Sequence, residues 1–468
     1  MSGTDDMADA YRHVPCATPQ YTVFSLWSSE LGRAVFFTLP GFNFGLASAV
    51  PQFNRLPELF TAVARTLLHV VCCHYFDDFN VTEPVWAATS GQRVLGELLR
   101  VIGFPFSAAK HISVGPEVVF LGVVSSFEKF EELGLVAMSV KPARIEKLVQ
   151  GFDEVLERGT LSCAQAARMA GKLGFTMCWA FGRFGRAPMQ PLHARASDTD
   201  GSWGDPLSPA LRASLNFFRS LLPCLEPYVF EAEPSQEPPT LVWTDGRYDM
   251  DQDEYPWSTP IRCPYVEGQP KAGVGYVVAT PKRGAPAAVG PCPQRMSVAE
   301  AKERLATQYD FVHGSADVPE SFMEGFSPRK QYIGQVELLG ALVPYISVPH
   351  LLGGRRVIHW IDNTSAIAAM VKGYSARPDS ARLVHAWHAL NTDLRARVWF
   401  EYVPTDANIA DAPSRLPLWN GFYHFGFHDK QGSGLGSVAE NLIIPAEQQW
   451  DDQAATWASG EPAWGPGC

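Results

Sequence analysis

The sequence predicts an α+β protein in which two strand-rich regions are joined by a helical one. Short apolar runs of strand length alternate with runs of amphipathic helical period on both sides of the middle of the chain. A Pro- and Glu-rich stretch at residues 231–240 separates the two strand-rich regions and is typical of a domain boundary. Each region also places carboxylates within apolar runs, where an uncompensated charge is costly to bury.

The first region begins with a hairpin and a helix. Residues 20–27 and 32–40 have the pattern of two paired strands. Residues 46–68 have the pattern of a helix that two prolines punctuate. Residues 70–82 then read as two apolar strands folded about a pair of aspartates.

The next elements continue the alternation. A capped helix is predicted from Ser90, a strand over residues 117–127, and an amphipathic helix over residues 143–159 that ends at Gly159. Beyond it, residues 158–197 contain six Lys or Arg and no acidic residue, although the whole chain carries a net charge of −11. This local basic surface is either a solvated helix face or an element that contacts phosphates.

Composition indicates the class of protein. The 468 residues are enough for two to four domains. Nine cysteines without a CxxC spacing indicate reduced thiols in an intracellular protein, in the cytoplasm or the nucleus. The N-terminal residues lack the apolar core of a signal peptide, and the apolar region 56–76 is interrupted by charged residues, so we expect no contact with a membrane.

A first group of carboxylates is predicted from Asp6, Asp77 and Asp78. A strand that carries Asp6 beside the hairpin of Asp77 and Asp78 would bring the three together. Three carboxylates can hold two divalent cations, which compensate their repulsion and can promote phosphoryl transfer. Asp5 also lies in this strand, but its spacing to the following residues fits less well.

The motifs of this region resemble those of the reverse transcriptases. The sequence YFDD, which ends at Asp78, resembles their YxDD motif, and Asp6 with Tyr11 resembles the motif of the first catalytic aspartate. Three further matches lie in the expected order: Phe44 and Gly45 within residues 39–55, Lys110 at the end of GFPFSAAK, and FLG at 120–122, which resembles the primer grip.

The resemblance assigns roles to these residues. It implies that Tyr11 excludes a 2′-hydroxyl, that Phe44 and Gly45 contact template and nucleotide, and that Lys110 lies near the incoming triphosphate. Simpler interpretations remain open: Tyr11 as an ordinary strand aromatic, Lys110 as a surface lysine, and Gly45 as a residue that permits a tight backbone.

The helical segment resembles the thumb and connection of retroelement enzymes, especially those of the DIRS-like and related retrotransposons. The match lies in residues 166–192. It implies that Arg183 and Arg186 lie along the phosphates of the template and primer.

A second group of carboxylates follows the Pro-rich stretch. Asp245 lies in a predicted strand, Glu337 near the start of a helix, Asp362 at the end of a strand, and Asp411 in a short helix. Four such carboxylates can organise two Mg²⁺ ions for attack by water on a phosphodiester. Asp362 could instead cap the following helix, and Asp406 is an alternative to Asp411.

The order Asp, Glu, Asp, Asp resembles that of ribonuclease H, most closely at WTDG, VELLG, IDNTSA and NIADAPSR. The resemblances imply a reverse-transcriptase palm and thumb/connection followed by an α/β ribonuclease H-like domain. The expected domains are a palm, a thumb/connection, a ribonuclease H-like domain and a disordered tail, at 1–139, 140–230, 238–418 and 419–468. Residues 249–270 and 285–330 are expected to be loop insertions.

The implied function is that of a retrotransposon RNA-directed DNA polymerase with ribonuclease H activity. Its implied cofactor is Mg²⁺, two ions per active site, which Mn²⁺ could replace. Its implied partners are an RNA template, an RNA–DNA hybrid and deoxynucleoside triphosphates.

The family's fingers subdomain normally precedes the first catalytic aspartate, whereas five residues precede Asp6 here. We therefore expect an N-terminally truncated chain with weak or no DNA synthesis. The alternatives are a catalytically silent nucleic-acid-binding relic and a nuclease that uses only the ribonuclease H-like domain.

Overall fold

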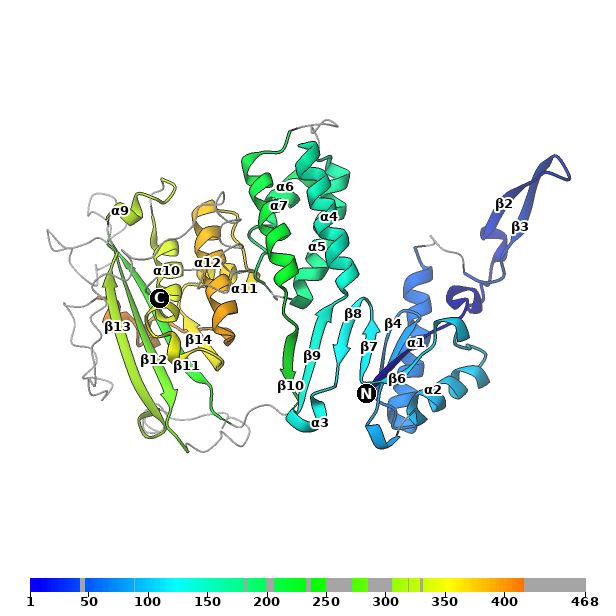
Figure 1. Ribbon diagram of the computed structural model, residues 1–468, viewed down its shortest axis with the longest axis horizontal. Helices are drawn as coiled ribbons and strands as arrows, with labels where there is room; N and C mark the ends of the chain where they lie inside the picture. The colour runs from blue at the N-terminus through cyan, green and yellow to red at the C-terminus, as the bar shows by residue number, and fades with distance from the viewer. Residues whose placement is uncertain are drawn as a thin grey trace. The chain divides into compact units, whose positions relative to one another are not determined.

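The computed structural model describes residues 1–42, 47–87, 89–180, 183–198, 206–232, 237–249, 272–284, 305–318, 320–328 and 331–415. The chain divides into two compact units (Figure 1). The first contains Met1–Lys141 together with the segment Pro227–Glu233, which includes strand β10 (Tyr228–Glu231). The second contains the other described residues from Pro142 onward. Helices and strands are mixed in both units, so the predicted α+β class is confirmed.

The first unit is built on an antiparallel sheet in the order β4-β5-β1-β6. These strands are β1 (Ser2–Asp6), β4 (Cys72–Tyr75), β5 (Asp78–Thr82) and β6 (Ile112–Gly115). Helices α1 (Ala49–Leu67) and α2 (Ser90–Val101) bury their apolar residues against one face of this sheet, where Phe53, Leu95 and Phe79 meet in one core. Because side chains alternate along a strand, the neighbours of Phe79 point to the opposite face.

A second sheet of the first unit has the order β10-β9-β8-β7. Its strands β7 (Glu117–Phe120), β8 (Val123–Ser126) and β9 (Leu135–Val140) are consecutive, and the short helix α3 (Phe130–Leu133) precedes β9. Strands β2 (Val23–Ser28) and β3 (Arg33–Thr38) form the predicted hairpin.

One expected strand of this unit is wrong. Residues 117–127 were expected to form a single strand, but the chain turns at Leu121 and Gly122, between β7 and β8. Both residues have positive φ, 52° and 81°, which is the geometry of a two-residue type I′ hairpin. The FLG sequence thus lies at a hairpin turn.

The second unit begins with helices α4 (Pro142–Arg158), α5 (Cys163–Ala180), α6 (Gln190–Ala196) and α7 (Pro209–Leu221). The chain leaves α4 at Gly159, whose φ of 71° ends the helix as expected. Helix α7 begins where the side chain of Ser208 accepts a hydrogen bond from the backbone N–H of Leu211, 3.2 Å away.

A mixed sheet in the order β13-β12-β11-β14-β15 forms the rest of the second unit. Its strands are β11 (Thr240–Tyr248), β12 (Ala272–Pro281), β13 (Tyr309–Asp317), β14 (Arg356–Ile361) and β15 (Arg397–Tyr402). Strands β11, β12 and β13 are antiparallel neighbours, whereas β14 and β15 run parallel to β11. This is the ribonuclease H-like arrangement that the sequence predicted.

The region expected to be an insertion at 285–330 is partly regular structure. Residues 309–317 form β13, paired along its whole length with β12, and α9 (Glu320–Met323) follows. The expectation of a loop was wrong there because pairing with β12, rather than local composition, determines this strand. Residues 250–271 and 285–304 lie outside the described residues.

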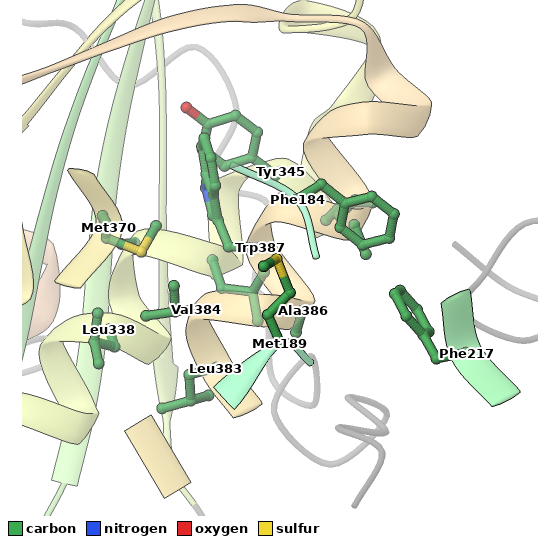
Figure 2. Packing of buried hydrophobic residues seen from close by; sticks show 14 of the residues in the cluster. Phe184, Met189, Phe217, Leu338, Tyr345, Met370, Leu383, Val384, Ala386 and Trp387 are labelled. Atoms are coloured by element: carbon green, nitrogen blue, oxygen red, sulfur yellow. The ribbon is translucent and has the colours of Figure 1, made fainter. Parts of the chain in front are cut away.

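Helices α10 (Ile333–Ser347), α11 (Thr364–Lys372) and α12 (Pro378–Leu394) complete the core, with the short α13 (Asp411–Ser414) near the end of the described chain. Figure 2 shows Trp387 of α12 beside Tyr345 of α10, with Met189 of the helical segment near Trp387. Phe184 and Phe217 of the helical segment belong to the same cluster. One core therefore joins the helical segment and the ribonuclease H-like sheet. Among the described helices, none combines the length and the apolar character needed to cross a bilayer.

Candidate metal centre

Three carboxylates from three elements converge in the second unit. Asp245 comes from β11, Glu337 from α10, and Asp362 directly follows β14. One ligand oxygen from each lies within 4.8 Å of the other two. Asp245 and Glu337 are 3% and 4% exposed, so two of these acids are nearly withdrawn from water.

The sheet register brings Asp245 and Asp362 together. Strands β11 and β14 are parallel neighbours, and Thr244 lies opposite Ile361. The residues that follow these two, Asp245 and Asp362, therefore lie next to each other at the same end of the two strands. A histidine ties the supporting elements: the ring of His359 lies 2.9 Å from Oγ1 of Thr244 and 3.2 Å from the hydroxyl of Tyr345 in α10. Complete burial lowers the pKa of His359 to about 3, so this ring is neutral.

Glycines allow α10 to approach β11. A Cβ atom on Gly246 would lie 2.7 Å from the backbone nitrogen of Glu337, and a Cβ atom on Gly340 would lie 3.0 Å from the carbonyl oxygen of Asp245. Larger residues at either position would separate the strand from the helix. The close contact is what places Glu337 beside Asp245.

Asp362 faces the site because its neighbour caps the helix. The side chain of Asn363 accepts hydrogen bonds from the backbone N–H groups of Ser365 and Ala366, at 3.1 and 3.0 Å. Asn363 is therefore the N-cap of α11, and the carboxylate of Asp362 takes no part in the capping.

Asp411 lies close to the three carboxylates but is paired with Arg415. Nε and Nη2 of Arg415 donate to its Oδ1, at 3.0 and 2.7 Å. Its charge still acts on Asp245 and Asp362, whose pKa values it raises. Asp406 is exposed in a turn after β15.

Burial and mutual repulsion make it unfavourable for Asp245, Glu337 and Asp362 to carry their negative charges together without a cation. Burial raises the pKa of Asp245 to about 7, with further repulsion from Asp362 and Asp411. Burial likewise raises the pKa of Glu337 well above its usual value, and the pKa of Asp362 is also raised. Oε2 of Glu337 is buried and has no hydrogen-bond partner.

These properties fit a divalent cation. Mg²⁺ and Mn²⁺ prefer oxygen ligands, and a cation would compensate three converging carboxylates. It would also supply a partner for the unsatisfied oxygen of Glu337.

Several residues that hold the carboxylates in place were not evident from the sequence. The side chains of Thr405 and Asn408 bond to Asp362, and Asn408 also donates to the carbonyl oxygen of Thr244 at 3.0 Å. Ser414 donates to Oδ2 of Asp245. The sequence contained one signal, the Asn408-x-x-Asp411 spacing, but local spacing does not reveal a contact with β11.

The first unit brings Asp6 and Asp78 together on the sheet face opposite to Phe79. They are opposite each other in the pairing of β1 with β5, and their side chains share a hydrogen bond. Burial raises the pKa of Asp78 to about 6, with added repulsion from Asp77 and Asp6. The exposed Lys110 is paired with this group, with Nζ at 2.8 Å from Oδ2 of Asp6.

This first group is less compact than the second. Across the described part of the chain, the Asp245 group is the one set of three Asp, Glu, His or Cys residues whose ligand atoms lie within 4.8 Å. Phe76 and Asp77 form the tight turn between β4 and β5, and Asp78 begins β5. Phe76 has a φ of 54°, which is uncommon outside glycine. Asp5 points to the other face, where His111 and Gln92 contact its carboxylate at 2.6 and 2.8 Å.

The remaining candidates make other contacts or lie outside the described residues. The ring of Tyr11 packs on Phe53, with centroids 4.8 Å apart. Arg186 donates to the carbonyl oxygen of Lys372 at the end of α11, 3.0 Å away, and Arg183 is exposed beside it. Phe44 and Gly45 lie outside the described residues.

Comparisons with known proteins give a likeness to solved structures. No protein-family model and no curated protein matches the chain. One similar structure is a foamy viral protease-reverse transcriptase dRH in complex with double-stranded DNA, with 15% identity and a TM-score of 0.39 over 86% of this chain. Another is a foamy viral protease-reverse transcriptase in complex with double-stranded DNA, with 16% identity and a TM-score of 0.36, also over 86% of this chain.

The chain covers 57% of the first of these structures and 67% of the second. At such identities and TM-scores, the likeness carries no information on substrate or activity.

Proposed function

We propose that the second unit is a metal-dependent ribonuclease that cleaves the RNA strand of an RNA–DNA hybrid. The observation that carries this proposal is the convergence of Asp245, Glu337 and Asp362 within 4.8 Å in a ribonuclease H-like sheet. The unpaired oxygen of Glu337 supports it further.

The chain's own residues hold the site in an orientation suited to this chemistry. Ser414 orients Asp245, the backbone N–H of Gly246 bonds to Glu337, and Asn408 bonds to Asp362. Bound Mg²⁺ would lower the pKa of an attacking water and stabilise the charge that develops on the phosphate. Fixed carboxylates need little reorganisation when the reaction begins.

The experiment is cleavage of a labelled RNA–DNA hybrid in Mg²⁺ by wild-type protein and by Asp362→Asn. We expect Asp362→Asn to abolish cleavage, since it removes one of the converging negative charges. Asp406→Asn is the matched control, because Asp406 is an exposed acid of the same polypeptide region, and it should retain wild-type cleavage. Cleavage that survives Asp362→Asn would contradict the proposal.

We also propose nucleotidyl transfer by the first unit, as in a retroelement RNA-directed DNA polymerase that uses an RNA template and deoxynucleoside triphosphates. The ordered sequence motifs support a DIRS-like or related retrotransposon, and the pairing of Asp6 with Asp78 supports a shared carboxylate site. Two cations could be held there with Asp77.

Primer extension on poly(A)/oligo(dT) tests this second proposal. We expect any synthesis to be lost in Asp78→Asn and kept in Asp9→Asn, whose aspartate is exposed and paired with Arg12. Hybrid binding without synthesis or cleavage would instead indicate a silent nucleic-acid-binding relic.

A further inference from the structure

A buried arginine, Arg247, lies next to the candidate metal centre. Arg247 is 6% exposed and follows Asp245 by two residues in β11, so both side chains point to the same face of the sheet. Its guanidinium is paired with Asp249 and lies 3.6 Å from Asp317. A charged group this deeply buried needs such partners, and they fix its position.

Arg247 holds the end of α13. Its Nε donates to the carbonyl oxygen of Ser414, 3.2 Å away. Ser414 is 3% exposed, and its hydroxyl donates to Oδ2 of Asp245 while lying 3.0 Å from the carbonyl oxygen of Asp411. Ser414 therefore links α13, the helix that carries Asp411, to the carboxylate of Asp245.

Two glycines of β12 make the space for this contact. Gly275 is opposite Asp245 in the sheet, and a Cβ atom on it would lie 2.7 Å from Cα of Ser414. A Cβ atom on Gly273 would lie 3.0 Å from Nη2 of Arg247 and equally close to the carbonyl oxygen of Ser414. The sheet surface is therefore shaped to receive Arg247 and Ser414 together.

We propose that Arg247 and Ser414 are positioning residues that set the orientation of Asp245 for the metal. Arg247 fixes the backbone of Ser414, and the hydroxyl of Ser414 donates a hydrogen bond to Oδ2 of Asp245. This bond orients the carboxylate of Asp245 so that its other lone pairs face Glu337 and Asp362. This inference rests on the proposed function of the same site. Residues that orient metal ligands typically change metal affinity by about 10- to 100-fold when they are replaced.

The test is a calorimetric titration of the full chain with Mn²⁺ alone. It compares the wild type with Ser414→Ala, Arg247→Lys and Ser347→Ala. Ser414→Ala removes only the hydroxyl, and we expect about tenfold weaker Mn²⁺ binding. Arg247→Lys keeps a charge beside Asp249 but lacks the Nε donor, and should weaken binding in the same direction. Ser347→Ala is the matched control, because Ser347 also ends a helix and bonds to a helix carbonyl at 2.8 Å.

Hybrid cleavage gives a second measurement on the same variants. In Ser414→Ala we expect the Mn²⁺ concentration for half-maximal cleavage to rise about tenfold, with the KM for hybrid unchanged and activity recovered at high Mn²⁺. A lower melting temperature with wild-type Mn²⁺ affinity would overturn the inference and show a merely structural role. Mn²⁺ binding absent from the wild type would overturn the proposed function as well, so the two failures are distinguishable.

Discussion

Asp362 and Asn363 are adjacent, yet the structure gives them separate roles. Both are residue types that cap helices, and the sequence left open whether Asp362 caps α11 or belongs to the group of carboxylates. The hydrogen bonds assign the cap to Asn363 and leave Asp362 beside Asp245 and Glu337. The order of the acids in the sequence predicted a group that includes Asp245, Glu337 and Asp362. It did not predict the contacts of Ser414 and Arg247, because these join residues far apart in the chain.

The separation of these roles predicts the behaviour of Asn363→Ala. Loss of the cap should lower the free energy of unfolding of the second unit by about 1 kcal/mol, since two backbone N–H groups lose their partner. Hybrid cleavage should persist, because the carboxylate of Asp362 is unchanged. Urea unfolding and the cleavage assay measure the two effects, and a loss of cleavage as complete as in Asp362→Asn would contradict the assignment.

The raised pKa of Asp245, about 7, predicts how stability depends on pH when no divalent cation is added. In the unfolded chain this carboxyl ionises near its ordinary pKa of about 3.9. Between about pH 4 and pH 7 the folded state keeps a proton that the unfolded state has released, so stability falls as pH rises through this window.

Thermal unfolding in EDTA should therefore show a lower melting temperature at pH 8 than at pH 5.5. Asp245→Asn should reduce this difference, because asparagine does not ionise. Mg²⁺ should raise the melting temperature of the wild type at pH 8, where the carboxyl is charged. A wild-type melting temperature that rises between pH 5.5 and pH 8 in EDTA would contradict this prediction.

At the scale of elements, local signals predicted the helices better than the strands. The helix that ends at Gly159 was anticipated from a glycine after an amphipathic run. The turn at Leu121 was missed because a leucine with positive φ has no sequence signature. Strand β13 was missed because its pairing partner β12 is distant in sequence. The close approach of α10 to β11 at Gly246 was likewise not evident before the register was known.

This close approach predicts a strong effect of Gly246→Ala. The added Cβ would lie 2.7 Å from the backbone of Glu337, so α10 must shift, and we expect a loss of about 1–3 kcal/mol of stability together with weaker Mn²⁺ binding. Gly171→Ala is the control: it lies in α5, where an added Cβ meets no described atom within 4 Å. That variant should gain about 1 kcal/mol from helix propensity. Equal effects of the two substitutions in urea unfolding would contradict the packing.

At the scale of the molecule, the helices α4 to α7 share a core with the ribonuclease H-like sheet. Phe217 of α7 is fully buried, packs against Phe184, and lies beside His385 of α12, with ring centroids 5.8 and 5.5 Å apart. The sequence predicted α4 from its amphipathic period, and the resemblance implied that the segment after it is helical. It could not show which partner their apolar faces contact, because the period identifies a buried face without identifying what covers it.

The shared core predicts cooperative unfolding within the second unit. Phe217→Ala should remove about 3–5 kcal/mol of stability, and hydrogen exchange should quicken in α5, α10 and α12 together. Phe53→Ala, which empties a fully buried position of the first unit, should leave these three helices unchanged. Exchange that quickens in α7 but not in α10 or α12 after Phe217→Ala would show that the helical segment is a separate folding unit.

The most direct test of the candidate metal centre is calorimetric titration of the wild type and of Glu337→Gln with Mg²⁺. Glutamine keeps the size of the side chain but removes the charge of the acid whose Oε2 lacks a partner. We expect saturable binding by the wild type and at least about tenfold weaker binding by Glu337→Gln, with loss of hybrid cleavage. The same Mg²⁺ affinity in both proteins would contradict a metal held by Asp245, Glu337 and Asp362.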